Sequence, residues 1–224
     1  MNGLSLEQKD APEVILVDYG VGNLRSVEKA LAAAGARVRL SGDAEVLRKA
    51  GKVLLPGVGA FGDGMRGLQE RGLVDVLQEL VRRGTPLLGI CLGMQLLFAA
   101  SEEAPGCPGL GLLPGEARRF TFDEDTGSPG AAGRLKVPQT GWNQILAVQE
   151  NSSLLQGLPE GSYAYFNHSY YCDPGQAGDV LAHTDYGCLY ASIVGRSNLY
   201  GVQFHPEKSQ AVGLQILRNF VERC

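Results

Sequence analysis

Short apolar runs alternate with helical patterns through the first half of the chain, and this alternation restricts the fold more than any other feature. Apolar runs typical of buried strands lie at residues 13–18, 37–40, 52–55 and 85–90. Apolar side chains recur at helical spacing over residues 24–34 and 73–80, and Gly35 and Gly84 follow these two patterns. Strands that alternate with helices need crossover connections. The first half therefore predicts a mainly parallel sheet with helices on both faces.

The second half has a different pattern, in which short runs alternate apolar and polar residues. Such runs lie at residues 118–122, 144–148, 162–166, 180–183, 190–194 and 199–204, and they predict antiparallel strands added to the sheet. Residues 123–133 are polar and rich in glycine and alanine, which predicts a loop, and residues 209–221 predict a closing helix. We expect one three-layer α/β domain over residues 13–224, preceded by an N-terminal extension over residues 1–12.

The apolar run at 85–90 leads into the sequence Gly89-Ile90-Cys91-Leu92-Gly93, which has the G-x-C-x-G pattern. Residues 94–100 after it are largely good helix formers, so we expect a strand, a sharp turn and a helix through residue 100. This is the nucleophile elbow pattern with cysteine in the serine position. The glycines would serve both strained dihedral angles and close packing.

Cys91 would lie at the positive end of the following helix, where a thiol ionises more readily than a free one. The thiolate is the nucleophilic form of cysteine. An arbitrary cysteine is more often a small buried core residue. The elbow favours a nucleophile here.

A base and an acid for this nucleophile are present together in His205-Pro206-Glu207. On an extended backbone, residues i and i+2 point to the same side, and Pro206 is expected to keep the segment extended. The alternative is a surface histidine beside an unrelated acid. The position after the strand at 199–204 favours the catalytic interpretation, because α/β sheets present their sites where strands end.

A glycine-rich turn, Pro56-Gly57-Val58-Gly59, ends the third strand and should lie on the same rim as the elbow. Its backbone N–H groups, together with that of Leu92, are candidates for an oxyanion hole. The alternatives are a plain turn or a dinucleotide fingerprint, since residues 57–62 match G-x-G-x-x-G. No clear ribose-binding acid follows, which weakens the fingerprint.

Composition excludes several classes of function. The chain has 20 Lys and Arg against 24 Asp and Glu, a formal net charge of −4, which gives no basic surface for nucleic acid or an anionic membrane. No secretory signal or long apolar stretch is evident. The five cysteines are an odd number without a C-x-x-C pair, which favours a reducing compartment over a disulfide framework. We expect a cytoplasmic protein that binds neither nucleic acid nor membrane.

The elbow, the 56–59 turn and the 205–207 segment together resemble the class I (triad-type) glutamine amidotransferases, over about Val14 to Phe220. Four more strings are similar to those of glutaminase subunits of imidazole glycerol phosphate synthases of histidine biosynthesis; they lie at 18–24, 138–143, 165–170 and 201–209. The resemblance implies that Cys91 attacks the side-chain amide of glutamine, giving a thioester and ammonia. His205 would then move the protons and Glu207 would hold it. It implies no metal ion and no cofactor.

The resemblance also implies residues for substrate and partner. Gln95 and Glu103 would hold the glutamine, with the backbone near Ser169 and Tyr170 lining the same pocket. Ammonia would pass to a (β/α)8 cyclase subunit in a heterodimer; such a barrel takes about 250 residues, so it must be a separate chain. Glutaminase activity would stay low until the loaded partner completes the oxyanion hole. Residues expected at that interface are Asn23, Trp142 and Lys208.

The chain departs from the family pattern at Gln139, which occupies a position where these proteins usually have histidine. This puts in doubt a role for that side chain but does not affect the triad. Trp142, the only tryptophan, has a core-filling role as its alternative. For the whole chain, the alternatives are the glutaminase of another ammonia-transferring synthase, or a non-catalytic scaffold in which Cys91 senses redox state.

Overall fold

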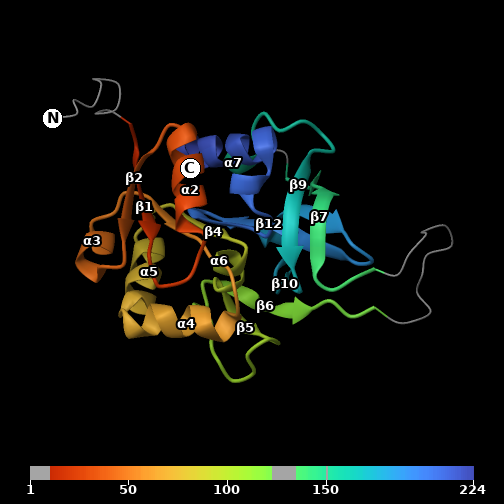
Figure 1. The fold of residues 1–224 in the computed structure, drawn as a ribbon, viewed down its shortest axis with the longest axis horizontal. Helices are drawn as coiled ribbons and strands as arrows, with labels where there is room; N and C mark the ends of the chain where they lie inside the picture. Colours follow the sequence, from red (N-terminus) through yellow and green to blue (C-terminus); the bar gives the residue numbers. More distant parts are fainter. Residues whose placement is uncertain (1–10, 123–134, 150) are drawn as a thin grey trace.

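The computed structural model describes residues 11–122, 135–149 and 151–224. A central sheet crosses the whole molecule, and its first-half strands are parallel (Figure 1). The parallel part of the sheet has the order β2 (Arg37–Ser41), β1 (Glu13–Val17), β3 (Val53–Leu55), β4 (Leu87–Ile90) and then β13 (Leu199–Val202) from the second half. Strand β13 from the end of the chain thus pairs in parallel with β4 and brings its C-terminal end beside that of β4.

The strands beyond β13, apart from β5, come from the second half of the chain and pair mostly antiparallel. They follow in the order β12 (Leu189–Arg196), β10 (Tyr170–Pro174), β6 (Leu113–Arg119) and β5 (Phe98–Ser101), and β12 also pairs with β11 (Val180–Asp185), which pairs with β8 (Leu146–Ala147). Strands β5 and β6 are parallel to each other. A separate antiparallel ribbon consists of β7 (Gln139–Gln144) and β9 (Tyr163–His168). The predicted α/β fold, with antiparallel strands in the second half, is confirmed.

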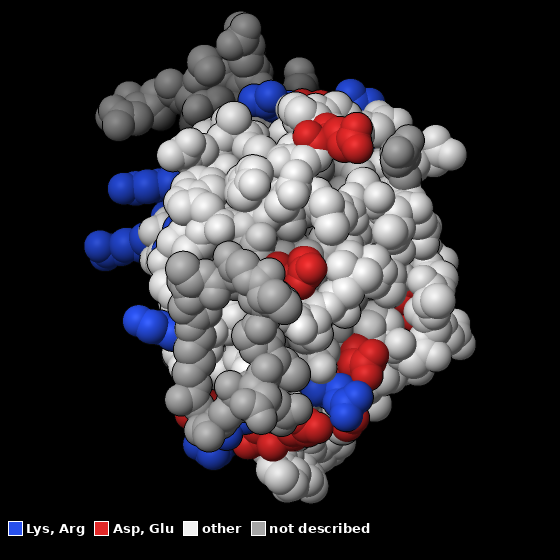
Figure 2. All heavy atoms as spheres, turned by 90° about the vertical axis from the view of Figure 1, so that its right-hand side faces the viewer, with Lys and Arg blue, Asp and Glu red and all other residues white. Residues whose placement is uncertain are grey.

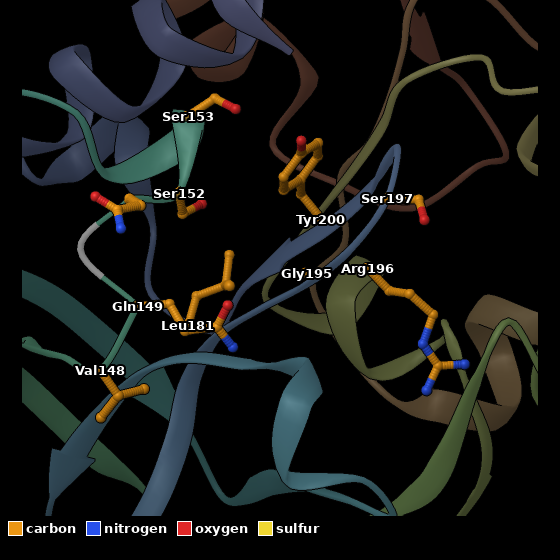
Figure 3. Close-up of a pocket in the computed structure, with 10 residues that line it drawn as sticks. Val148, Gln149, Ser152, Ser153, Leu181, Gly195, Arg196, Ser197 and Tyr200 are labelled. Carbon is orange, nitrogen blue, oxygen red and sulfur yellow. The ribbon is translucent and has the colours of Figure 1, made fainter.

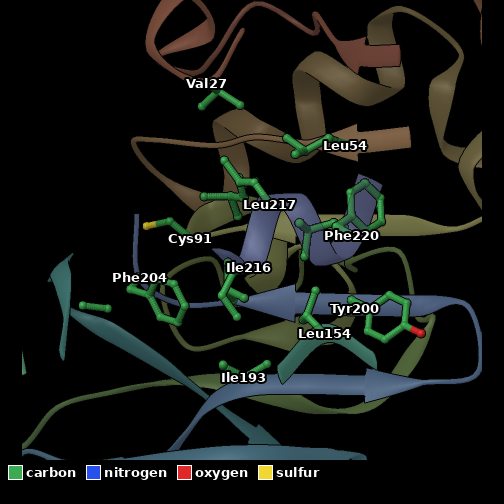
Figure 4. Packing of buried hydrophobic residues seen from close by; sticks show 14 of the residues in the cluster. Val27, Leu54, Cys91, Leu154, Ile193, Tyr200, Phe204, Ile216, Leu217 and Phe220 are labelled. Atoms are coloured by element: carbon green, nitrogen blue, oxygen red, sulfur yellow. The ribbon is translucent and has the colours of Figure 1, made fainter. Parts of the chain in front are cut away.

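Helices cover both faces of the sheet and bury alternate residues of its strands (Figure 1). On one face, α2 (Leu24–Ala33) and α7 (Gln210–Arg223) pack over Val14 and Leu16. On the other, α3 (Ala44–Arg48), α4 (Phe61–Glu70) and α5 (Leu73–Arg82) pack over Ile15 and Val17. Figure 4 shows part of the α7-side cluster, with Cys91 at its margin. The site therefore stands on a closely packed three-layer core.

The helix expected after the elbow is shorter than predicted. Helix α6 (Leu92–Gln95) has a single turn, and β5 occupies part of the stretch to residue 100 that the sequence assigned to a helix. Leu96, Leu97 and Phe98 are all fully buried, so the segment has no polar face. An apolar run of this kind fits a helix or a strand equally well, and pairing with β6 decides the outcome.

Other elements differ in extent from the prediction. The structure has helices α3 and α4 and strand β10, which the sequence analysis did not predict. The predicted strand at 144–148 is largely wrong, because it overlaps β7 only at Gln144 and otherwise contains only the two-residue strand β8. The predicted strand at 118–122 overlaps only the last two residues of β6. Single 3-10 turns lie at η1 (Ser153–Leu155), η2 (Ala177–Asp179) and η3 (Pro206–Lys208). The predicted loop at 123–133 and most of the predicted N-terminal extension lie outside the described residues. Among the described helices, none is long and apolar enough to cross a membrane.

Candidate active site

Cys91 lies at the turn between β4 and α6 with a backbone conformation unusual for a residue with a side chain. Its φ is 53° and its ψ is −110°, and its side chain is nearly buried. A non-glycine residue in such a region costs roughly 1–3 kcal/mol and persists only where the surroundings impose it. The Cys91 N–H donates to the carbonyl of Val202 at 2.8 Å, which fixes the turn to β13. The predicted sharp turn between a strand and a helix is present at Cys91, and its role as the nucleophile stays a prediction.

The glycines of the elbow serve packing alone, which corrects part of the prediction. A Cβ at Gly93 would collide with the carbonyl oxygen of Leu55, and one at Gly89 would lie 2.6 Å from the carbonyl oxygen of Gly93. Neither glycine has a positive φ. The strained dihedral angles belong to Cys91 itself, and the glycines let α6 lie directly against β3 and β4.

His205 and Glu207 form a buried pair beside the elbow. The Nδ1 of His205 donates to Oε1 of Glu207 at 2.9 Å, and only 4% and 1% of the two side chains are exposed. The backbone turns into η3 at Pro206, so the predicted extended segment is wrong, and the turn brings the carboxylate to the imidazole. Because Nδ1 faces Glu207, Nε2 is the nitrogen available to Cys91.

His205 favours its protonated form strongly. Burial lowers its pKa, but hydrogen bonds to Cys91 and Glu207, together with their negative charges, outweigh burial and raise the pKa to about 10. An imidazolium beside Cys91 stabilises a thiolate there. Helix α6 has only four residues, so its dipole adds little, and His205 supplies the charge that the sequence analysis assigned to a helix end.

A cavity of about 260 Å³ opens in front of Cys91. Its lining comes from the elbow, the 58–59 turn, β9, β10 and the start of η3. The lining residues are Val58, Gly59, Cys91, Leu92, Gln95, Glu103, Pro138, Asn167, His168, Ser169, Tyr170, His205 and Lys208. The structure thus brings together the four predicted substrate-binding residues, two residues of the triad and most of the oxyanion turn. Glu207 lies behind His205, outside the lining.

Contacts with Tyr19 and with the elbow fix the turn at residues 56–59, the candidate oxyanion turn. The hydroxyl of Tyr19 donates to the carbonyl of Pro56 at 2.6 Å. Gly57 packs against the elbow, where a Cβ would lie 2.6 Å from the amide nitrogen of Gly93, and it does not line the cavity. Leu92 is the first residue of α6, a position whose N–H has no partner within a helix and is free to meet an anion.

Two polar side chains on the far side of the cavity keep acceptor atoms unused. Nε2 of Gln95 donates to the carbonyl of Tyr170 at 2.9 Å and to Oε1 of Gln203 at 3.3 Å, so its own oxygen remains available. Oε2 of Glu103 accepts the N–H of Phe61 at 2.7 Å, which fixes the carboxylate and leaves its second oxygen. Both side chains can therefore accept hydrogen bonds from an ammonium group.

Gln203 is a site residue that the sequence analysis did not single out. It is completely buried, and its Nε2 lies 3.8 Å from Sγ of Cys91. The signal in the sequence is its spacing, because Gln203 precedes His205 by two residues at the end of β13 and faces the same side.

His168 lies in the cavity wall, and its pKa is shifted in the opposite direction from that of His205. Burial lowers its pKa to about 4, and the charge of His205 adds to this, although a hydrogen bond to Tyr170 opposes it. Its Nδ1 donates to the carbonyl of Tyr170 at 2.8 Å. Gln139, opposite His168 on β7, accepts a bond of 2.9 Å from the hydroxyl of Tyr190. The unusual glutamine is therefore a buried partner of a tyrosine behind the cavity.

The three predicted interface residues lie at the surface. Trp142 on β7 is 48% exposed, so its alternative role as a core filler is wrong. Its ring meets that of Tyr165 edge-on, and Nζ of Lys208 lies 5.5 Å from the centre of the same tyrosine ring. Asn23 precedes α2 and makes no capping hydrogen bond with its side chain.

A second hollow, of about 600 Å³, has no part of this chemistry (Figure 3). It lies at the turn between β12 and β13, at the opposite end of β13 from His205. Its one cation, Arg196, is paired with Asp179 by bonds of 2.7 and 2.6 Å. Size alone therefore does not identify the active site.

The model of the family "Glutamine amidotransferase class-I" matches residues 15–224. The chain belongs to this family. Two curated relatives of this amidotransferase are named imidazole glycerol phosphate synthase subunit HisH: one from Gloeobacter violaceus is 50% identical, with 95% of this chain and 90% of that protein covered. The other, from Moorella thermoacetica, is 47% identical, with 93% and 94% covered.

Solved structures with the same fold are more distant in sequence. A crystal structure of a glutamine amidotransferase has a TM-score of 0.69 at 22% identity and covers 93% of this chain and 97% of its own. PurLQS from Thermotoga maritima has a TM-score of 0.71 at 18% identity, with 94% and 97% covered. At these identities the likeness extends to the fold of the amidotransferase and no further.

Proposed function

We propose that this amidotransferase is the glutaminase subunit of an imidazole glycerol phosphate synthase, acting in histidine biosynthesis. One observation carries the chemistry: Cys91, His205 and Glu207 meet at the end of β4 and β13, with Cys91 opening onto a cavity. The name shared by relatives about half identical over nearly the whole chain supports the pathway. The domain spans residues 13–224, and the cytoplasm is the expected location.

Hydrolysis begins with the Cys91 thiolate attacking the side-chain carbonyl carbon of glutamine. Negative charge develops on the carbonyl oxygen, which the N–H of Leu92 and the turn at Val58 and Gly59 stabilise. His205 gives its Nε2 proton to the departing nitrogen, and ammonia leaves as the C–N bond breaks. Neutral His205 then accepts a proton from water, whose oxygen attacks the thioester. Glutamate leaves and the thiolate is restored.

The cavity recognises the amino-acid end of glutamine through its free acceptors. Glu103 and the oxygen of Gln95 accept hydrogen bonds from the α-ammonium group, and the carboxylate of Glu103 offsets its charge. The backbone at Ser169 and Tyr170 forms the opposite wall. A volume of about 260 Å³ suits a single small amino acid.

Ammonia passes to a separate (β/α)8 cyclase subunit in a heterodimer. The docking surface consists of Asn23, Trp142 and Lys208 with the exposed Val58, whose side chain is 40% accessible at the cavity mouth. Because Val58 belongs to the oxyanion turn, contact with a loaded partner can complete the oxyanion hole and raise hydrolysis.

Glutamate release with and without the cyclase tests both parts of the proposal. We expect slow hydrolysis by the isolated chain, faster hydrolysis in the complex with cyclase substrate, and loss of hydrolysis in Cys91→Ser. Full activity of the isolated chain would contradict activation by the partner. Unchanged hydrolysis by Cys91→Ser would contradict the assignment of the nucleophile.

A further inference from the structure

Gln203 approaches the same sulfur as the triad histidine but is uncharged. It follows the last residue of β13, and its backbone N–H donates to the carbonyl of Ser192 at 2.9 Å, so its main chain is fixed by β12. Its side chain has no exposed surface, and the 3.8 Å contact from Nε2 to Sγ of Cys91 is directed across 112 positions of sequence. A buried amide of this kind needs partners for both of its ends.

The orientation of this amide is determined by Gln95. Nε2 of Gln95 has two hydrogens, and it donates one to the carbonyl of Tyr170 and one to Oε1 of Gln203. Rotating the Gln203 amide by half a turn would place nitrogen against nitrogen at Gln95. It would also place an oxygen against the sulfur of Cys91. The hydrogen-bond network therefore aims the N–H of Gln203 at the sulfur.

The other titratable groups near Cys91 do not supply a second positive charge. Tyr19 from the end of β1 and Cys172 from β10 interact electrostatically with Cys91, and burial raises the pKa of both, so they stay neutral. His205, paired with Glu207, is the cation. Among the described residues, Gln203 is therefore the uncharged one whose side-chain N–H is directed at the sulfur of Cys91.

We propose that Gln203 is a positioning residue that holds the Cys91 sulfur and stabilises its thiolate through the amide N–H. Gln95 locks this donor and also faces the substrate cavity, so one chain of hydrogen bonds joins the nucleophile to the cavity wall at Tyr170. The inference rests on the proposed function only for Cys91 as nucleophile. Its effect on the thiolate is independent of the substrate.

The pH dependence of Cys91 alkylation by iodoacetamide tests this directly in the full chain. Mass spectrometry distinguishes Cys91 from the other four cysteines. In Gln203→Leu, which removes the donor, we expect the rise in alkylation to move about one pH unit higher, with about tenfold slower alkylation below the midpoint. In Gln203→Glu, which keeps the shape and replaces the donor by a carboxylate, we expect a larger move in the same direction.

Asn219→Leu is the matched control. Asn219 is also completely buried, and its amide donates to carbonyls of Leu154 and Gln156 away from Cys91. We expect this variant to lose stability in thermal unfolding and to keep the parental alkylation profile. Profiles of Gln203→Leu and Gln203→Glu that overlap the parent would overturn the proposal, and so would an equal shift in Asn219→Leu.

A measurement on the unsubstituted chain decides the matter if a Gln203 variant does not fold. The side-chain amide protons of Gln203 should shift in NMR spectra over the pH range in which Cys91 becomes reactive, and an invariant signal overturns the proposal. Glutamine hydrolysis in the cyclase complex is measured separately. There, Gln203→Leu should lower kcat more than it raises KM. Alkylation needs neither glutamine nor the partner. An alkylation result that contradicts the role of Gln203 therefore does not contradict the proposed glutaminase function. If the glutaminase function is contradicted instead, the alkylation experiment still tests the role of Gln203.

Discussion

Two histidines line the same cavity and differ widely in their affinity for protons. Hydrogen bonds to Cys91 and Glu207 and their negative charges outweigh burial and raise the pKa of His205 to about 10. Burial, together with the charge of His205, lowers the pKa of His168 to about 4. The first can donate a proton to a leaving group at neutral pH, and the second stays neutral and holds the Tyr170 carbonyl. Neighbouring charge, rather than residue type, assigns the roles.

The raised pKa of His205 sets the alkaline limit of hydrolysis. As pH rises through about 10, the imidazolium loses its proton and kcat should fall, because no acid remains for the departing nitrogen. Glu207→Gln removes one of the negative charges that raise this pKa, so the fall should begin about one pH unit lower. A pH profile of kcat for parent and variant measures this. An unchanged alkaline limb would contradict the role of Glu207.

The lowered pKa of His168 predicts loss of stability in acid. Between pH 6.5 and about 4 the unfolded chain binds a proton that the folded chain does not, so the free energy of unfolding falls as pH falls through this window. The loss from this residue approaches about 3 kcal/mol near pH 4. Urea unfolding at several pH values should show a flatter acid limb for His168→Gln. Equal slopes for parent and variant would disprove the assignment.

At the scale of elements, the elbow depends on contact between α6 and two strands. Gly93→Ala forces a methyl group against the carbonyl oxygen of Leu55, and neither backbone can move without disturbing β3 or α6. We expect a loss of about 3 kcal/mol in the free energy of unfolding. Gly51→Ala is the control, since a Cβ there meets nothing within 4 Å and the glycine has no positive φ. Urea unfolding of the two variants compares them, and equal stability would contradict the packing argument.

The sequence predicts the elements whose pattern is local. Strands β1, β3 and β4 are apolar runs buried on both faces, and α2 and α5 have one apolar face, so all five are predicted from their own residues. Strand β5 is not, because its apolar composition fits a helix until β6 pairs with it.

In the candidate site, too, residues in local motifs could be predicted from the sequence, whereas contacts between distant strands could not. Cys91 and His205 converge because they follow the neighbouring parallel strands β4 and β13. The predicted substrate residues come from elsewhere, with Gln95 in α6, Glu103 after β5, and Ser169 and Tyr170 where β9 leads into β10. The contact of Gln203 with Cys91 depends on the register between β13 and β4, which pairs Gly201 with Gly89 and Val202 with Ile90. No local pattern specifies that register. The buried partner of Gln139, the hydroxyl of Tyr190, comes likewise from a strand distant in sequence.

At the scale of the whole molecule, charged side chains leave a broad uncharged area on the face toward β7 and β9. Figure 2 shows this face, where most of the described atoms belong to uncharged residues, the Lys and Arg side chains lie mainly toward the edges, and acidic atoms lie near the centre. We expect the proposed cyclase partner to dock on this area, because the cores of protein interfaces contain few charged residues.

Trp142 is the exposed side chain best suited to anchor that partner. Trp142→Ala should weaken cyclase binding by at least about tenfold, since exposed tryptophans at interface centres often contribute 2 kcal/mol or more. The fold should be unaffected because the ring is 48% exposed. Val148→Ala, which truncates a 53% exposed side chain beside the second hollow, is the control. Calorimetric titration with the cyclase measures both, and equal affinities would place the interface elsewhere.

The pairing of β4 with β13 also fixes the order in which the protein becomes reactive. Cys91 lies in the first half of the sequence, but its proposed base, His205, follows β13 near the end. Pairing two strands so distant in sequence is slow compared with forming the local βα units. A refolding chain should therefore regain helical signal before Cys91 gains its reactivity toward iodoacetamide. Until β13 docks against β4, Cys91 lacks the neighbouring imidazole of His205, so the reactivity of the folded site depends on the last strand of the sheet.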